Sequence, residues 1–159
     1  MSTAYLLIGG NLGDRIENLH HAAKLIGGQC GTITASSSVY ETAAWGYTDQ
    51  PSFLNQALAI TTTLNARQLM RKVLRIEKEM GRLRKEKMGP RVIDIDIIFF
   101  DDEVHELRFL TIPHPEMQNR RFVLTPLAEI APQFEHPVLK KTVAELLEEC
   151  PDNLEVKKF

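Results

Sequence analysis

The sequence predicts an α+β domain of the ferredoxin-like type, with a largely antiparallel sheet and helices packed on it. Two observations support this prediction. Segments with strand and helix periodicity follow one another in the order β-α-β-β-α-β. The length of 159 residues also suits one domain over residues 1–159, which can bury a core without disulfides or structural metals.

The first half of the chain predicts three strands, over residues 4–8, 32–41 and 53–63. Between the first two strands lies a helix, which Asp14 caps together with Glu17. We expect Gly27 and Gly28 to end this helix, since glycine commonly follows the last helical turn.

The second half predicts a strand at 91–100, a shorter strand within 104–111, a short helix or turn at 119–131 and a last helix that ends near Pro151. Before these elements, the predicted strand over 53–63 is followed by a helix that opens at Asn65 and Gln68 and ends at Gly81. Thr142 and Glu145 have the spacing of a capping box for the last helix.

The overall composition is that of a soluble intracellular protein. The net charge of −2 does not suggest a polycation that binds nucleic acid. The N-terminus has no basic segment followed by a long apolar stretch, and no apolar run approaches membrane-spanning length. We therefore expect a cytoplasmic monomer with no membrane or nucleic-acid partner, in which Cys30 and Cys150 remain reduced thiols.

Two aspartates interrupt the most apolar predicted strand. Asp94 and Asp96 are two residues apart, so the period of a strand places both carboxylates on one face of the sheet. One interpretation is a polar face turned to water or paired with arginine. The other is a Mg²⁺ site, because Mg²⁺ takes oxygen ligands and keeps positions for water and substrate phosphates.

A basic segment immediately before this strand favours the metal interpretation. Residues 81–91 contain five cationic side chains and one acid, and they run directly into the aspartate strand. Cations for phosphate oxygens and carboxylates for Mg²⁺ thus lie side by side in the sequence. Phosphoryl transfer needs this combination of charge neutralisation and positioning.

Other motifs are less informative. The segment LIGGNLGDR lacks both the Walker pattern and the dinucleotide fingerprint, so we interpret it as a tight turn between strand and helix. Trp45, Phe53 and Asn55 suit either core packing or a pocket for a flat heterocycle, and Phe122 offers another ring. His114 lies in a rigid Pro-His-Pro turn that fixes the direction of its imidazole.

Several of these segments together resemble the 6-hydroxymethyl-7,8-dihydropterin pyrophosphokinase family of folate biosynthesis. The matching segments, in family order over residues 5–132, are IGGNLGDR, SSVYET, DQPSFLNQA, RIEKEMGRLRKEKMGPRVIDIDIIFF and LTIPHPEMQNRRFVLTPLAEIAP. The family fold is ferredoxin-like, in agreement with the predicted order of elements. The resemblance implies transfer of diphosphate from ATP to the pterin hydroxyl, with AMP as the second product.

The resemblance also implies roles for individual residues. Asp94 and Asp96 match the ligands of two Mg²⁺ ions, and Asp96 is a candidate to accept the hydroxyl proton. Matches to the ATP side are Glu77, Arg82, Arg84, Arg91, His114 and Arg120, of which Arg82 and Arg91 are the expected catalytic arginines. Matches to the pterin pocket are Thr42, Ala43, Trp45, Phe53, Asn55 and Phe122, with the two phenylalanines on either side of the ring.

Two rival functions remain open at the level of sequence. A ferredoxin-like nucleic-acid-binding module would use the basic segment on phosphates and the aromatic residues for stacking. It would lack the aromatic-rich RNA-binding signature, and Asp94 and Asp96 would repel a phosphate backbone in the absence of metal. A metal-dependent nuclease would instead cleave phosphodiesters without pterin.

Overall fold

The structure is a computed structural model that describes residues 1–43, 51–81 and 92–159. In this part of the chain the main sheet contains β1 (Ser2–Gly10), β2 (Thr32–Ser36), β3 (Tyr40–Thr42), β4 (Phe53–Thr62), β5 (Asp94–Phe100) and β8 (Val156–Lys158). Its strand order is β5-β1-β4-β3-β8, with β2 also paired to β4, and each of these pairings is antiparallel. The predicted ferredoxin-like class is confirmed.

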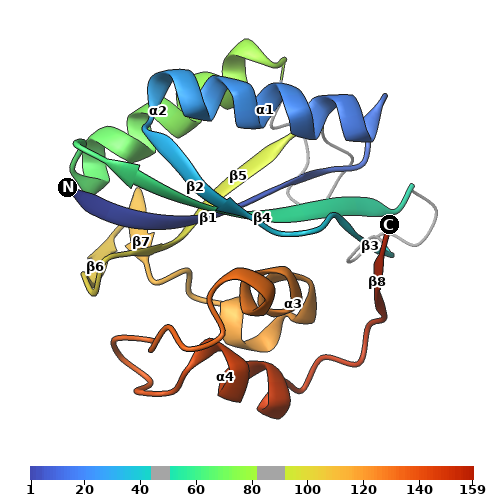
Figure 1. Cartoon of the computed structure of the whole chain (residues 1–159), viewed down its shortest axis with the longest axis vertical. Coiled ribbons are helices and arrows are strands. Elements are labelled where there is room, and N and C mark those ends of the chain that lie inside the picture. The colour runs from blue at the N-terminus through green and yellow to red at the C-terminus, as the bar shows by residue number, and fades with distance from the viewer. Residues whose placement is uncertain (44–50, 82–91) are drawn as a thin grey trace.

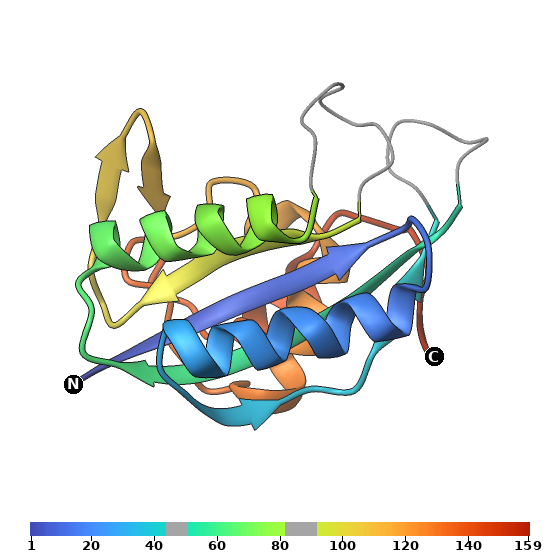
Figure 2. The same cartoon turned by 90° about the horizontal axis from the view of Figure 1, so that it is seen from above.

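Helices cover both faces of this sheet (Figure 1). One face carries α1 (Arg15–Gln29) and α2 (Ala66–Glu79), which run side by side when seen from above (Figure 2). The other face carries α3 (Arg121–Ile130), which packs against α4 (Val143–Glu149). Among the described residues, the core is accordingly split into two apolar clusters, one on each face of the sheet. No helix in the described ranges is long and apolar enough to cross a membrane.

The predicted helix starts are confirmed by their capping contacts. The Asp14 side chain accepts a hydrogen bond from the backbone N–H of Glu17, at 3.1 Å. Reciprocal capping boxes open α2, between Asn65 and Gln68, and α4, between Thr142 and Glu145. Each contact satisfies backbone donors that the first turn of a helix leaves without intrahelical partners.

The predicted end of the first helix is wrong. Gly27 and Gly28 lie inside α1, which continues to Gln29 and is capped by Cys30. A helical glycine costs about 1 kcal/mol relative to alanine, which does not suffice to end the helix here. The last turn contributes the fully buried Ile26 and the buried Cys30 to the core, so tertiary packing overrides the propensity.

The predicted strand over 32–41 is divided into β2 and β3 by Ser37. The backbone N–H of Ser37 donates to the Ala57 carbonyl, and the Ser37 hydroxyl accepts from the Ala57 N–H, both at 2.9 Å. The side chain thus replaces the backbone acceptor of a regular ladder. Because the Ser37 hydroxyl accepts in place of a backbone carbonyl, one extended segment forms two short strands that both pair with β4.

The C-terminal half contains two elements that the sequence did not predict correctly. The expected strand within 104–111 is a hairpin of β6 (His105–Leu107) and β7 (Leu110–Ile112), which projects beyond the sheet in Figure 2. Strand β8 was not predicted, because three residues, Val-Lys-Lys, show no apolar alternation. The segment 119–131, predicted as a short helix or turn, forms the helix α3 and is preceded by the short 3-10 helix η1 (Met117–Asn119).

A buried histidine on the α4 side leads to a prediction about pH. His136 is 5% exposed, and its Nδ1 accepts hydrogen bonds from the backbone N–H groups of Val138 and Leu139, at 3.1 and 3.0 Å. Burial lowers the pKa of His136. As the pH falls through about 6.5, the unfolded chain takes up this proton before the folded protein does. The His136 contribution to stability is therefore complete above that pH and is lost as the pH falls toward the folded pKa.

We expect urea unfolding to show lower stability at pH 5 than at pH 7.5. In His136→Asn the amide oxygen can still accept a hydrogen bond but does not take up a proton in this range. This variant should therefore show a weaker pH dependence than the wild type. An unchanged pH dependence would contradict this role.

Candidate active site

The two strand aspartates lie on the face of the sheet that α3 covers. On β5, Asp96 is paired with Leu7 of β1 and Asp94 with Gly9. Paired residues of antiparallel strands share a face, and Leu7 belongs to the apolar cluster on the α3 side. Ile95, between the aspartates, belongs to the opposite cluster. Both carboxylates are partly exposed, and they share one face as their spacing predicted.

The predicted pterin residues continue on this face across the neighbouring strands. Gly9 of β1 is paired with Asn55 of β4, and Phe53 of β4 is paired with Thr42 of β3. Two strand spacings separate Asp94 from Asn55, so their backbones are about 10 Å apart. The structure therefore brings the carboxylates and the predicted pterin residues onto one surface, from strands far apart in sequence.

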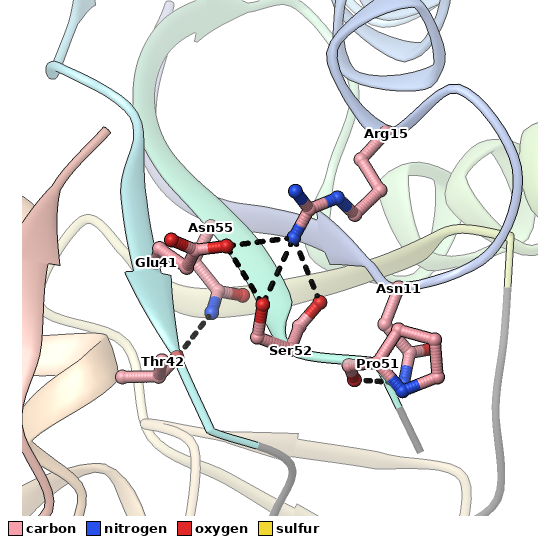
Figure 3. Close-up of polar contacts among 7 residues, drawn as sticks. All are labelled: Asn11, Arg15, Glu41, Thr42, Pro51, Ser52 and Asn55. Carbon is pink, nitrogen blue, oxygen red and sulfur yellow. Dashed lines mark hydrogen bonds and ion pairs between the residues drawn. The ribbon is translucent and has the colours of Figure 1, made fainter.

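The Asn55 side chain is held between its neighbours. Asn55 and Thr42 are 6% and 4% exposed, and the Asn55 amide lies 3.4 Å from the Thr42 hydroxyl (Figure 3). The amide presents both a donor and an acceptor, which suits the edge of a nitrogen heterocycle. Phe53 is only partly buried, so part of this residue is accessible to a ligand.

Gly9 makes room for this asparagine. A Cβ atom at residue 9 would collide with the Asn55 side chain and would lie 2.8 Å from the Leu54 carbonyl oxygen. The predicted end of the first strand at residue 8 is wrong, since β1 continues through Gly10 and its last two glycines pair with Asn55 and Leu54. The predicted tight turn to the helix follows over 11–14. Sequence reasoning missed Gly9 as a site residue. Its only signal was a glycine at the end of an apolar strand.

Helix α3 places Phe122 over this face. Phe122 is in the first turn of α3 and packs against the apolar cluster on the α3 face of the sheet. Glu129, on the same helix, accepts a hydrogen bond from the Tyr40 hydroxyl of β3 at 2.6 Å and one from the Ser38 N–H at 2.9 Å. These contacts fix α3 against β3. A sandwich of the pterin between Phe53 and Phe122 stays a prediction.

His114 and Arg120 approach the aspartate side of this surface. The backbone N–H of His114 donates to the backbone carbonyl of Ile98 on β5 at 3.1 Å. Burial and the nearby charge of Arg120 lower the pKa of His114, against the opposing influence of Glu116 and Asp94. A neutral imidazole at pH 7 can donate and accept a hydrogen bond. The Arg120 guanidinium carbon lies 6.0 Å from the centre of the Phe122 ring.

Glu77 supports β5 from the other side. This carboxylate on α2 is 4% exposed, and its Oε2 accepts a hydrogen bond from the backbone N–H of Ile95 at 2.8 Å. Ile95 separates Asp94 from Asp96, so the contact fixes the strand between the two carboxylates. The ATP-side role of Glu77 stays a prediction.

This contact predicts different effects for two substitutions of Glu77. Glu77→Ala leaves the buried Ile95 N–H without this acceptor and should lower the free energy of unfolding by about 1–3 kcal/mol. Glu77→Gln keeps an acceptor oxygen and should lose less. Urea unfolding measures both, with the exposed Glu79→Ala on the same helix as control. Equal losses in the Ala and Gln variants would rule out the hydrogen bond as the cause.

Four predicted site residues, Trp45, Arg82, Arg84 and Arg91, lie outside the described residues, and their roles stay predictions. Thr42 and Ala43 also line a pocket of about 290 Å³. Its other walls come from Glu41 and Ser52 and from the C-terminal residues Leu154, Glu155 and Lys157. This pocket includes neither Asp94 nor Asp96.

The described residues fit Mg²⁺ as a partial ligand set. Asp94 and Asp96 offer hard carboxylate oxygens from one face of a strand. No group of three or more His, Cys, Asp or Glu side chains suited to a metal occurs within 1–43, 51–81 and 92–159. Water and phosphate oxygens would then occupy the other coordination positions, as is common for Mg²⁺.

Comparison with known proteins identifies the family. Residues 5–132 match the model of 7,8-dihydro-6-hydroxymethylpterin-pyrophosphokinase (HPPK). Two relatives are named 2-amino-4-hydroxy-6-hydroxymethyldihydropteridine pyrophosphokinase. The one from Bacillus subtilis is 46% identical over 83% of this chain and 80% of its own length. The one from Aquifex aeolicus is 41% identical over 91% of this chain and 90% of its own length.

A solved structure agrees in fold. Plasmodium falciparum HPPK-DHPS, wild type with SDX-DHP, superposes with a TM-score of 0.75 at 19% identity. The match covers 94% of this chain and 43% of that longer one. With this family model and these relatives, the chain belongs to the 7,8-dihydro-6-hydroxymethylpterin-pyrophosphokinase family.

Proposed function

We propose that the protein transfers diphosphate from ATP to 6-hydroxymethyl-7,8-dihydropterin in a Mg²⁺-dependent step of folate biosynthesis. The products are AMP and the pterin diphosphate. The observation that carries the proposal is the common face of the sheet shared by Asp94, Asp96, Asn55 and Thr42. Family membership gives the same reaction class.

The pterin end of the site provides shape and hydrogen bonds. Asn55 and Thr42 read the edge of the heterocycle, while Phe53 and Phe122 contact its two faces. A ring held there directs its hydroxymethyl group along the sheet toward β5. Holding the nucleophile in one direction lowers the entropic part of the barrier.

The phosphate end provides charge. Asp94 and Asp96 would hold two Mg²⁺ ions, which supply charge neutralisation to the phosphates when bound. His114 and Arg120 approach the phosphates from the described part of the chain, while Arg82, Arg84 and Arg91 are the further cations expected from the sequence.

The transfer balances as a simple displacement. The pterin hydroxyl oxygen bonds to the β-phosphorus of ATP, and the bond from that phosphorus to the α,β-bridging oxygen breaks. AMP leaves with the bridging oxygen and its electron pair. The hydroxyl proton passes to a base, for which Asp96 is our candidate. A displacement of this kind depends mainly on positioning and electrostatic stabilisation.

Product analysis tests the proposal. The protein is incubated with ATP, Mg²⁺ and 6-hydroxymethyl-7,8-dihydropterin, and AMP is separated from ADP. We expect AMP that forms only when the pterin is present. ADP would indicate an ordinary kinase and contradict attack at the β-phosphorus, while cleavage of RNA without pterin would support the nuclease.

A further inference from the structure

Arg15 joins two strand ends that border the pterin pocket. One nitrogen of its guanidinium, Nη1, lies 2.9 Å from Glu41 Oε2 and 3.0 Å from Ser52 Oγ, and also 3.1 Å from the Ser52 carbonyl oxygen. The Ser52 hydroxyl in turn donates to Glu41 Oε2 at 2.7 Å. Figure 3 shows these three side chains as a closed triangle, which we call the Arg15 triangle.

The triangle lies directly behind two predicted pterin residues. Glu41 precedes Thr42 on β3, and Ser52 precedes Phe53 at the start of β4. Because side chains alternate along a strand, Glu41 and Thr42 face opposite sides of the sheet. The triangle therefore lies on the face opposite Asp94 and Asp96, although Glu41 and Ser52 also line the pocket beside Thr42 and Ala43 at this edge. It acts on the backbone that carries Thr42 and Phe53, which are cross-strand partners.

The triangle is held by charge and packing. Two hydrogen bonds keep the pKa of Glu41 below its usual value. The larger effect comes from the Ser52 hydroxyl and the next from Arg15. The side chains of Arg15 and Glu41 are only 25% and 37% exposed. The guanidinium lies 5.6 Å from the ring centre of Phe159, whose N–H donates to the Val39 carbonyl at 2.9 Å. Phe159, which directly follows β8, thus places its ring beside the Arg15 guanidinium.

A second contact ties the same segment to the start of the helix. The side-chain amide of Asn11, which is 1% exposed, donates to the Pro51 carbonyl at 2.9 Å. Residues 51 and 52 are therefore tied to the segment from Asn11 to Arg15 at two points. Glu41 is tied to it through Arg15 alone among these contacts. Loss of Arg15 leaves Glu41 with only the Ser52 hydroxyl within the triangle and detaches this end of the β3–β4 pair from the start of α1, so Thr42 and Phe53 should be held less firmly.

We propose that Arg15 is a positioning residue for the pterin pocket, fixing from behind the sheet the position of the β3–β4 end that carries Thr42 and Phe53. This inference rests on the proposed function. It adds a residue with no part in binding metal or phosphate. Its signature is a selective effect on the pterin substrate, because the triangle lies at the β3–β4 end of the site and not beside β5.

The test compares the Michaelis constants for the two substrates in Arg15→Ala, by AMP formation with Mg²⁺. We expect the KM for pterin to rise about three- to tenfold, while the KM for ATP and kcat change less than about twofold. Arg15→Lys keeps a cation that can reach Glu41 and should recover part of the pterin KM. Lys141→Ala removes an exposed ion pair with Glu149, of 2.6 Å, and serves as the matched control.

The outcomes distinguish failure of the inference from failure of the proposed function. A wild-type protein that forms no AMP overturns the proposed function and the inference together. Normal wild-type turnover with an unchanged pterin KM in Arg15→Ala overturns the inference alone, as does an equal rise in both KM values. If Arg15→Ala does not fold, Ser52→Ala removes the hydroxyl shared by both charges, and an unchanged pterin KM there overturns the inference as well.

Discussion

Replacing either strand carboxylate, in Asp94→Asn or Asp96→Asn, should lower kcat by on the order of a thousandfold, since a bound metal supplies several kcal/mol of transition-state stabilisation. The amide keeps the size of the side chain but removes the negative charge that a divalent cation requires. Because both side chains are partly exposed and Ile95 supplies the core contact, the fold should persist.

Two measurements check this result together. Initial rates of AMP formation give kcat, and thermal unfolding shows that the variants remain folded. Asp102→Asn is the control, since Asp102 is an exposed carboxylate just beyond the end of the same strand. Near-normal turnover in both Asp94→Asn and Asp96→Asn would refute the metal assignment.

The second large effect is expected from Gly9→Ala. The new methyl group would collide with the Asn55 side chain and with the Leu54 carbonyl, neither of which can move freely inside the sheet. We expect a loss of about 1–3 kcal/mol in the free energy of unfolding. The displaced amide should also raise the KM for pterin by at least about tenfold, since it no longer meets the ring in register.

Gly28→Ala is the matched control for this substitution. Gly28 lies in α1, and a Cβ there would meet nothing within 4 Å. Alanine in a helix is favoured over glycine by about 0.5–1 kcal/mol, so this variant should be slightly more stable than the wild type. Gly9→Ala with wild-type stability and an unaltered pterin KM would show that Asn55 does not need this space.

Local sequence signals predicted the parts of the fold that depend on local physics. Asp14, Asn65 and Thr142 start helices because each cap is formed with a residue three positions along the chain. The division of β2 from β3 was not predictable, since it depends on Ser37 meeting Ala57 across the sheet. Strand β8 depends on pairing with β3, and its short lysine-rich sequence shows no strand periodicity.

The candidate site divides in the same way. The common face of Asp94 and Asp96 follows from the period of a strand and was predicted directly. Residue type suggested Asn55 only as one option for a heterocycle pocket, and the role of Thr42 came from family resemblance. Their contact joins two strands and could not be read from the sequence. Gly9, the Glu77 contact with Ile95 and the Arg15 triangle were missed, since each depends on a partner distant in sequence.

The central claim is that the aspartates and the pterin residues form one site on the α3 face. Paramagnetic Mn²⁺ in place of Mg²⁺ tests it directly, through relaxation of the protons of 6-hydroxymethylpterin bound beside a non-hydrolysable ATP analogue. We predict strong broadening, greatest at the hydroxymethyl protons and lost in Asp94→Asn when pterin still binds. Bound pterin with no broadening beyond that of the Asp94→Asn complex would contradict a shared site.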